Sequence, residues 1–216
     1  MKKITLLSLV AVLLTALTFT SCNTGDDNGY SYLTKEQQDA YQTKMAGFYP
    51  NLMLLFDHKN DANVKNQADS VETSCNFSMR NDSTFTISNF PIKKLAEHIS
   101  NPELKEAISK VEDKTVTGKY MVLPNSLTNQ AYFYACPNPI TLNLTYGSDA
   151  KEHKVVLYFS PHPYYVGSCI LSTKQIGFPF NLTYISVDGA QNNHIKNSIH
   201  SDAYVSFACH NKVTTK

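Results

Sequence analysis

The residue with the clearest chemistry in this chain is Cys22, whose thiol follows a segment typical of an export signal. Two lysines near the start precede an apolar run over residues 4–19, and Ser21 is the small residue immediately before the cysteine. A charged start, an apolar stretch too short to span a membrane and a small residue before the cut are typical of a secretory signal peptide. The pattern predicts that residues 1–21 are removed and that Cys22 becomes a lipidated first residue. A soluble chain cut near Ser21 is the simpler alternative.

The segment after the cysteine is predicted to be a flexible tether. Residues 22–31 are polar, contain two glycines and include the acidic pair Asp26–Asp27, a composition that favours a mobile linker. Residues 17–22 resemble the loose lipobox of Bacteroides-type bacteria, and the acidic pair resembles the signal that sends such lipoproteins to the outer face of the outer membrane. The resemblance implies an outer-membrane lipoprotein that faces the cell surface or the periplasm. The membrane is then its expected partner, through the lipid anchor. A linker whose aspartates carry no signal is the alternative.

Four further cysteines remain in the mature chain, namely Cys75, Cys136, Cys169 and Cys209. Disulfides are permitted outside the cytosol, and four cysteines allow three sets of pairings. Three of the four lie in apolar runs typical of strands, where a free buried cysteine is also common. The sequence therefore leaves disulfides and buried thiols as alternatives. No Cys-x-x-Cys spacing is present, so neither a zinc knuckle nor a thioredoxin-like site is expected.

The seven histidines show no spacing that predicts a metal site. None forms His-x-His or His-x-x-x-His, and Cys209 and His210 are adjacent, so they point to opposite faces of a strand. We expect no metal ion and no other cofactor. Neither a Gly-x-Ser-x-Gly elbow nor a His-Glu-x-x-His motif occurs. A catalytic triad assembled from distant residues stays open, because such triads have no fixed sequence spacing.

Tyrosines are the better candidates for contact with a ligand. Tyr132, Tyr134, Tyr164 and Tyr165 lie in segments predicted to be strands, whose side chains alternate between two faces. Exposed tyrosines stack on sugar rings or fill a pocket of a partner protein. The alternative is that half of them line the core while the others cover sheet edges. The absence of tryptophan argues against a glycan site.

Two serines lie in segments that resemble an O-glycosylation sequence. Asp69-Ser70-Val71 and Asp82-Ser83-Thr84 resemble the Asp-Ser/Thr-apolar sequence at which Bacteroides-type envelope proteins are O-glycosylated. Both are predicted to lie in loops or turns. The resemblance implies that Ser70 and Ser83 are candidate modification sites, although matches of three residues also arise by chance.

The elements that must position these residues are mostly strands. Thr34–Gln37 has the form of a capping box, which predicts a helix ending at Gly47, and two short helices are predicted after Pro91 and at Asn101-Pro102. Apolar and polar residues alternate strictly over residues 140–146, the clearest strand signal in the chain. Further strands are predicted at residues 48–56, 75–79, 84–88, 116–122, 130–135, 155–159, 164–171, 180–187 and 203–209. Eight to ten short antiparallel strands with two or three short helices predict a mainly β fold, either a β-sandwich or a closed lipocalin-like barrel.

This organisation resembles an uncharacterised single-domain lipoprotein family of Bacteroides-type bacteria. The resemblance rests on the helix before Gly47-Phe48-Tyr49, on the junction at residues 89–92 and on the lipid anchor. Gly47-Phe48-Tyr49 also resembles the Gly-x-Trp strand opening of lipocalin-like barrels. Neither resemblance implies a known activity.

Bulk composition narrows the function classes. Two of the 19 basic residues lie in the predicted signal peptide, which leaves 17 basic against 18 acidic side chains, so nucleic-acid binding is not expected. The length of residues 32–216 suits a single domain. We expect a non-catalytic binding role, for a small apolar or carbohydrate ligand or for another envelope protein. A structural or assembly role in the envelope is the second expectation, and a hydrolase is the third.

Overall fold

The computed structural model describes residues 32–57, 68–80, 82–148, 150–190, 193–196 and 204–212. The predicted signal peptide, the lipidation site Cys22 and the predicted tether lie outside these residues. Within them, no helix is long and apolar enough to cross a membrane.

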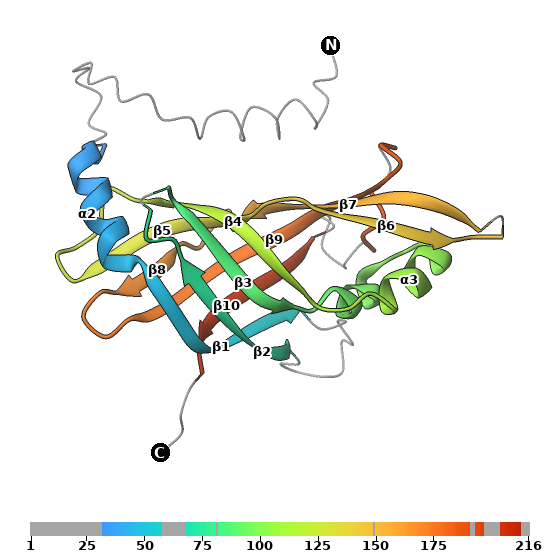
Figure 1. Cartoon of the computed structure of the whole chain (residues 1–216), viewed down its shortest axis with the longest axis horizontal. Helices are drawn as coiled ribbons and strands as arrows, with labels where there is room; N and C mark the ends of the chain where they lie inside the picture. The colour runs from blue at the N-terminus through green and yellow to red at the C-terminus, as the bar shows by residue number, and fades with distance from the viewer. Residues whose placement is uncertain are drawn as a thin grey trace, which may run out of the picture.

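Ten strands and three short helices make up the described part of the chain (Figure 1). The helices are α2 (Lys35–Met45), the 3-10 helix η1 (Ile92–His98) and α3 (Pro102–Ser109). The strands are β1 (Gly47–Asp57), β2 (Ala68–Phe77), β3 (Thr84–Phe90), β4 (Lys114–Val122), β5 (Gln130–Pro137), β6 (Ile140–Tyr146), β7 (Lys151–Pro161), β8 (Gly167–Ile170), β9 (Gln175–Val187) and β10 (Val205–Asn211). The mainly β fold with short helices is confirmed.

Eight of the strands close into an antiparallel barrel. They follow one another in the order β10-β1-β2-β3-β4-β5-β8-β9, and β9 pairs with β10 to complete the ring. Strand β10 makes this closure, since Cys209 pairs with Leu54 of β1 and Phe207 pairs with Phe180 of β9. Of the two predicted architectures, the chain adopts the barrel and not the sandwich.

Strands β6 and β7 form a hairpin that extends past the barrel. On the side of β9 away from β10, residues 175–177 pair with β8 and residues 180–187 pair with β7. Strand β6 is the last in the strand order, and its described pairing is with β7. The hairpin and α3 lie side by side at the right of Figure 1, at the end of the molecule opposite α2.

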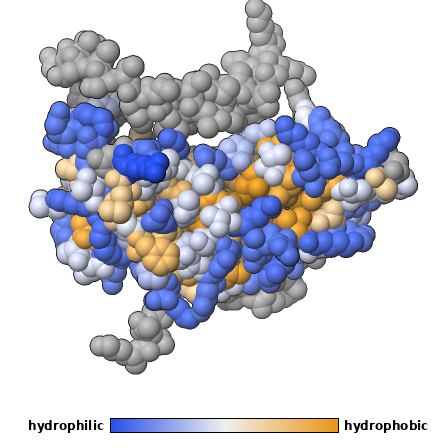
Figure 2. All heavy atoms as spheres, viewed as in Figure 1, coloured by the Kyte–Doolittle hydropathy of each residue, from blue (hydrophilic) through white to orange (hydrophobic). Residues whose placement is uncertain are grey.

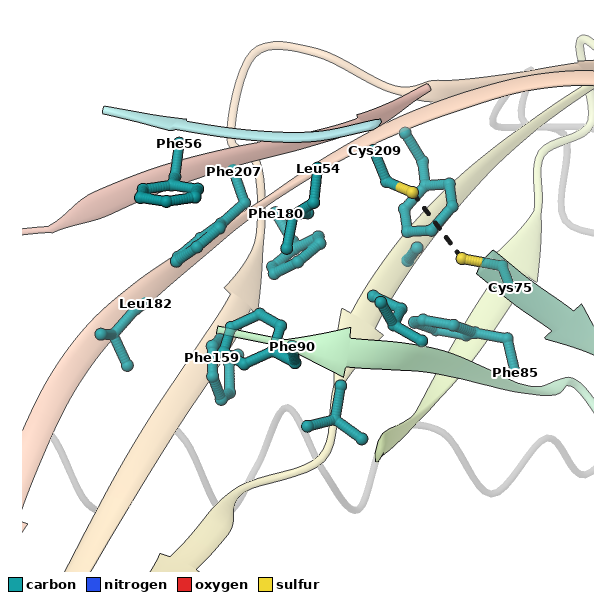
Figure 3. Close-up of a cluster of buried hydrophobic side chains, with 14 of the residues drawn as sticks. Leu54, Phe56, Cys75, Phe85, Phe90, Phe159, Phe180, Leu182, Phe207 and Cys209 are labelled. Carbon is teal, nitrogen blue, oxygen red and sulfur yellow. Dashed lines mark hydrogen bonds between the residues drawn. The ribbon is translucent and has the colours of Figure 1, made fainter. Parts of the chain in front are cut away.

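Aromatic side chains fill the barrel interior. Alternate residues of each strand point inward, as Ala131, Phe133 and Ala135 do on β5. Phe77 lies among five rings, with centroids 5.0 to 6.1 Å from its own, namely those of Tyr49, Phe85, Tyr120, Phe133 and Phe178. A second group of rings comprises Phe56, Phe90, Phe159, Phe180 and Phe207 (Figure 3). The rings occupy the space in which lipocalins hold a ligand.

Helix α2 lies across one end of the barrel. Its predicted capping box is formed, because Thr34 Oγ1 accepts from the Gln37 amide and the Gln37 side chain accepts from the Thr34 amide. The Tyr41 hydroxyl donates to the Ser126 carbonyl (3.1 Å) in the β4–β5 loop. Lys174, in the β8–β9 turn, donates to carbonyls at the end of the helix. These contacts hold α2 over two turns that share one end of the barrel.

The other end is closed by η1 and α3. Five apolar side chains of this segment are fully buried, namely Ile92, Leu95, Ile99, Leu104 and Ile108. The predicted cap of α3 is confirmed, since Asn101 Oδ1 accepts from the Leu104 amide at 2.9 Å. The two short helices therefore cover the apolar end of the barrel. The Asn101 cap fixes the first turn of α3.

The predicted strand at residues 164–171 is wrong at its start. Strand β8 covers only Gly167–Ile170, and Tyr164 and Tyr165 lie in the β7–β8 loop. His162 Nδ1 accepts hydrogen bonds from the amides of both tyrosines, at 3.2 and 3.1 Å. A side chain that bonds to nearby backbone amides competes with strand pairing, and it holds this segment in a turn.

Candidate binding site

A pocket of about 480 Å³ opens at the end of the molecule opposite α2. Three segments that are distant in the sequence form its wall: the start of α3, the β6–β7 hairpin and the residues around the end of β9. Seven of the lining residues can hydrogen bond through their side chains or stack on a ligand, namely Asn101, Glu103, Tyr146, Ser148, His153, Asp188 and His194.

A histidine–aspartate pair forms one side of this pocket. His153 Nδ1 lies 2.7 Å from Asp188 Oδ2, while Asp188 Oδ1 accepts from the Lys154 amide at 2.8 Å. The hydrogen bond from His153, and then that from the Lys154 amide, lower the pKa of the Asp188 carboxyl. Because Nδ1 is bonded to the carboxylate, the second ring nitrogen of His153 is the one that is not used in this pair.

The backbone holds Asp188 in place at the end of β9. Its φ of 50° lies in the left-handed region, and its amide donates to the Lys154 carbonyl at 2.9 Å. The following residue, Gly189, also has a positive φ, as a tight turn requires. The turn thus fixes the carboxylate against β7, and the carboxylate in turn fixes the ring of His153.

Tyr146 adds an aromatic surface next to this pair. Its ring centroid lies 4.4 Å from that of His153, with the two planes inclined by 35°. Leu144 is the direct partner of His153 across the β6–β7 ladder, so the contact between the two rings is a diagonal one. The two rings together present a rigid, half-buried aromatic face to the pocket.

The third wall joins α3 to the segment after β9. The Ser100 amide donates to the His194 carbonyl at 2.9 Å, and Ile99 and Ile195 form an isolated bridge. Asn101 Oδ1 is used by the helix cap, so its amide nitrogen is the group that remains to face a ligand. Glu103, in the first turn of α3, supplies a carboxylate.

Ser148 also lines the pocket, in the β6–β7 turn. Ser148 and Lys151 have a Ser-x-x-Lys spacing, a pattern found in some acyl-transfer enzymes on a helix. Here the two residues lie in a hairpin turn and at the start of β7, so the spacing does not place them on one helical face. Among the described residues, no three His, Cys, Asp or Glu side chains are arranged to hold a metal ion.

The four tyrosines predicted to contact a ligand lie away from this pocket. Tyr132 and Tyr134 are half-buried on the outer face of β5, opposite the inward-facing Phe133. Tyr164 and Tyr165 are 85% and 67% exposed in the β7–β8 loop. Strand β5 pairs with β8, so the two groups lie on neighbouring segments, but none of the four lines the pocket.

The two serines predicted to be O-glycosylated have different surroundings. The prediction that Ser70 lies in a loop or turn is wrong, because Ser70 is exposed on β2 and pairs with Leu55 of β1; its amide donates to Asp69 Oδ1 at 2.9 Å. Ser83 is half-buried in the β2–β3 turn, where its Oγ accepts from Gln42 Nε2 at 2.7 Å. Ser70 is therefore the more accessible of the two hydroxyls.

The four cysteines among the residues that the structure describes are free thiols. Cys75, Cys169 and Cys209 point into the barrel, whereas Cys136 is half-buried on the outer face of β5. Burial raises the pKa of Cys136 to about 12 and also raises that of Cys169. These thiols are therefore protonated near neutral pH and are weak nucleophiles.

Sequence reasoning missed the pair of His153 and Asp188. His153 lies 35 residues from Asp188, and no local spacing links the two. The one usable signal was Asp188-Gly189 at the end of an apolar run, which is typical of a turn that holds an aspartate in a fixed position.

A closed, eight-stranded antiparallel barrel with a filled interior and an outer polar pocket thus defines the class of this protein. The chain belongs to the family described as a domain of unknown function (DUF4840), whose model matches residues 41–187. The match includes Asn101, Glu103, Tyr146 and His153. No curated protein and no solved structure matches the chain.

Proposed function

We propose that this protein is a lipid-anchored outer-membrane protein with a non-catalytic binding role, and that the pocket beside the β6–β7 hairpin takes a small hydroxylated ligand of the carbohydrate class. The observation that carries the proposal is the pocket itself. It combines fixed donors and acceptors with an aromatic face in a volume of about 480 Å³, within the range of small-molecule sites.

The chemistry of the wall favours a ligand with several hydroxyl groups. His153, Asn101 and Glu103 all line the pocket, and they bring an imidazole ring, a side-chain amide and a carboxylate to its wall. Hydroxyl groups both donate and accept, so they suit a wall that mixes the two kinds of group. The ring of Tyr146 offers an apolar surface for the C–H face of a sugar. A purely apolar ligand would leave these polar groups unpaired.

The position of the pocket also supports a role at a membrane surface. The predicted tether joins the chain just before α2, and α2 lies at the end of the molecule opposite α3 and the β6–β7 hairpin (Figure 1), which contribute residues to the pocket. A chain anchored through Cys22 would therefore direct the pocket away from the membrane and toward soluble or extended glycans.

The ligand proposal is tested by recording amide chemical shifts of the ¹⁵N-labelled mature protein with a panel of hexoses, N-acetylhexosamines and uronic acids. A ligand should shift the amides of Tyr146, His153 and Asp188, and Tyr146→Ala should weaken binding about tenfold or more. Tyr164→Ala is the matched control, because that tyrosine is exposed but remote from the pocket. Pocket amides that stay unmoved with every sugar, or binding lost only in Tyr164→Ala, would contradict the proposal.

The anchor is tested separately by growing cells with an alkyne-tagged fatty acid and isolating the protein. The wild-type chain should carry the label and fractionate with membranes, whereas Cys22→Ser should do neither. A label that persists in Cys22→Ser, or is absent from the wild type, would contradict lipidation at this cysteine.

A structural or assembly role is the second candidate, favoured by the side of β6 that pairs with no other strand among the described residues. The strand has no charged residue, its Thr141, Asn143 and Thr145 are exposed, and it is the last strand in the sheet order. Such a strand can pair with an extended segment of another chain. Figure 2 shows an apolar area right of centre on the visible face, between hydrophilic ends. If β6 is the contact, Asn143→Lys should abolish any complex that native mass spectrometry detects. Lys154→Ala, on β7, is the control and should leave the complex intact.

A further inference from the structure

Cys75 and Cys209 face each other inside the barrel although their strands are not neighbours. Cys75 lies on β2 and Cys209 on β10, with β1 between them in the strand order. Figure 3 shows the two side chains approaching from separate strands, and their sulfur atoms are 3.7 Å apart. Among the described residues, this is the one close contact between two cysteine sulfurs.

The surroundings of this pair are apolar and closed. Cys75 is 1% exposed and Cys209 is not exposed at all, and Leu54 and Phe85 lie close by in the same cluster. The hydrogen bond with Cys75 and burial raise the pKa of Cys209 well above its usual range. A thiolate is therefore disfavoured once the barrel has closed, so any oxidation of the pair takes place while the chain is folding.

We infer that Cys75 and Cys209 form a disulfide when the protein folds in an oxidising compartment, and that Cys136 and Cys169 remain thiols. The inference rests on the envelope location proposed above but not on the binding pocket. The sulfurs must approach from 3.7 Å to about 2 Å. Because β1 lies between the two strands, their backbones are two strand spacings of about 4.8 Å apart, so β2 and β10 must also move until the Cα atoms are within about 7 Å of each other. Two S–H bonds break and one S–S bond forms. The two electrons and two protons pass to the disulfide of a thiol–disulfide oxidant, which leaves as a dithiol.

The other two cysteines have different partners. Cys169 is buried, and its sulfur lies 3.6 Å from the hydroxyl of Tyr49. Cys136 lies on the outer face of β5, where its thiol donates to the Phe159 carbonyl at 3.5 Å. Each of these thiols thus has an oxygen atom as its hydrogen-bond partner. A disulfide between Cys136 and Cys169 would have to join the outer face of the barrel to its interior.

The proposed link would tie the last strand of the barrel to the second. Cys75 and Cys209 are 134 residues apart in the sequence, so the bond would close a long loop in the unfolded chain. Long loops gain the most from such a constraint in the chain-entropy account of disulfides. The bond would also bridge β1, which pairs with β10 on one side and with β2 on the other.

The test is a two-step thiol labelling of the full mature protein, isolated from its native compartment without reductant. Denatured protein is treated with iodoacetamide, then reduced, then treated with N-ethylmaleimide, and its peptides are mapped by mass spectrometry. Cys136 and Cys169 should carry the first reagent, while Cys75 and Cys209 should carry the second. A link between another pair would overturn the inference. Iodoacetamide on all four cysteines would contradict a disulfide in the native compartment.

A second measurement tests whether Cys75 and Cys209 can form a disulfide, independently of whether the native compartment is oxidising. Purified chain is refolded in a glutathione redox buffer, and thermal unfolding is compared with and without reductant. Reduction should lower the midpoint of the wild type by about 10 °C. Cys75→Ala should show no such shift, and Cys169→Ala, equally buried, should keep it. A link that forms on refolding but is absent from native protein would support the pair and contradict the oxidising location. No shift in the wild type would overturn the inference.

Discussion

Tyr49 and Tyr120 are two buried tyrosines whose rings touch the same phenylalanine but whose hydroxyls differ. Both rings pack edge-on against Phe77, at 5.4 and 5.0 Å between centroids. The Tyr49 hydroxyl donates to the Met45 carbonyl and lies near Cys169. The Tyr120 hydroxyl has no partner among the described residues. A buried polar group without a partner keeps its desolvation cost, whereas a bonded one offsets it.

Replacing each tyrosine with phenylalanine should therefore affect the free energy of unfolding differently at the two positions. Tyr49→Phe should lower the free energy of unfolding by about 1 kcal/mol, because it leaves the Met45 carbonyl without its donor. Tyr120→Phe should leave the stability unchanged or raise it by up to about 1 kcal/mol, since it removes an unpaired hydroxyl. Urea unfolding of the two variants and the wild type provides the comparison. A loss in Tyr120→Phe as large as that in Tyr49→Phe would show that its hydroxyl has a partner.

At the scale of the elements, glycines in β4 and β8 make room for the rings that fill the barrel. A Cβ atom on Gly118 of β4 would lie 2.5 Å from the ring of Phe85 and 2.6 Å from the Cys136 carbonyl oxygen. A Cβ atom on Gly167 of β8 would lie 2.9 Å from the ring of Phe133. Both glycines are fixed by packing, and neither has a positive φ.

Strand packing therefore predicts unequal tolerance of alanine. Gly118→Ala should cost about 2 kcal/mol or more, because the backbone carbonyl of Cys136 cannot rotate away as a side chain could. Gly177→Ala, on β9, should be nearly neutral, since its nearest heavy atom would be 3.5 Å from the new Cβ. Chemical denaturation of the two variants checks the difference. Equal midpoints would mean that β4 can move away from β5 at little cost.

The sequence predicted helices and strands where their formation depends on nearby residues, and it did not predict features that depend on contacts between distant residues. The alternation over residues 140–146 and the cap at Asn101 depend on neighbours in the chain, and both are confirmed. The choice between sandwich and barrel depends on β10 pairing with β9 as well as β1, and alternation looks the same in both folds. Tyr164 and Tyr165 are residues typical of strands, but their amides donate to His162 Nδ1 and the two lie in a loop. The pocket joins three distant segments, so no local spacing could reveal it.

At the scale of the whole molecule, ionisable groups predict a stability that falls at both extremes of pH. Hydrogen bonds lower the pKa values of the Glu72, Asp82 and Asp188 carboxyls below those of the unfolded chain. Their contribution is fully present above the unfolded pKa of about 4 and is lost as the pH falls through the folded values. Burial raises the pKa values of Tyr49 and Tyr120. Their contribution is present below pH 10 or so and is lost as the pH rises further.

Thermal unfolding midpoints between pH 3 and pH 11, at constant ionic strength, measure this profile. Asp188→Asn should flatten the acid limb and leave the alkaline limb unchanged, because only the carboxylate has been removed. Tyr120→Phe should flatten the alkaline limb alone. A wild-type midpoint that rises between pH 5 and pH 3 would contradict the assignment of these carboxyls.

The closure of the barrel by β10 has a consequence for the order of events in biosynthesis. Its contacts with β1 join residues about 150 positions apart, which makes contact order high and folding slow. A ribosome delivers the chain from its N-terminus, so residues 205–211 emerge after the other nine described strands. Until they emerge, the seam between β1 and β9 stays open. A chain that lacks the segment from Val205 onward would therefore be unable to close the barrel.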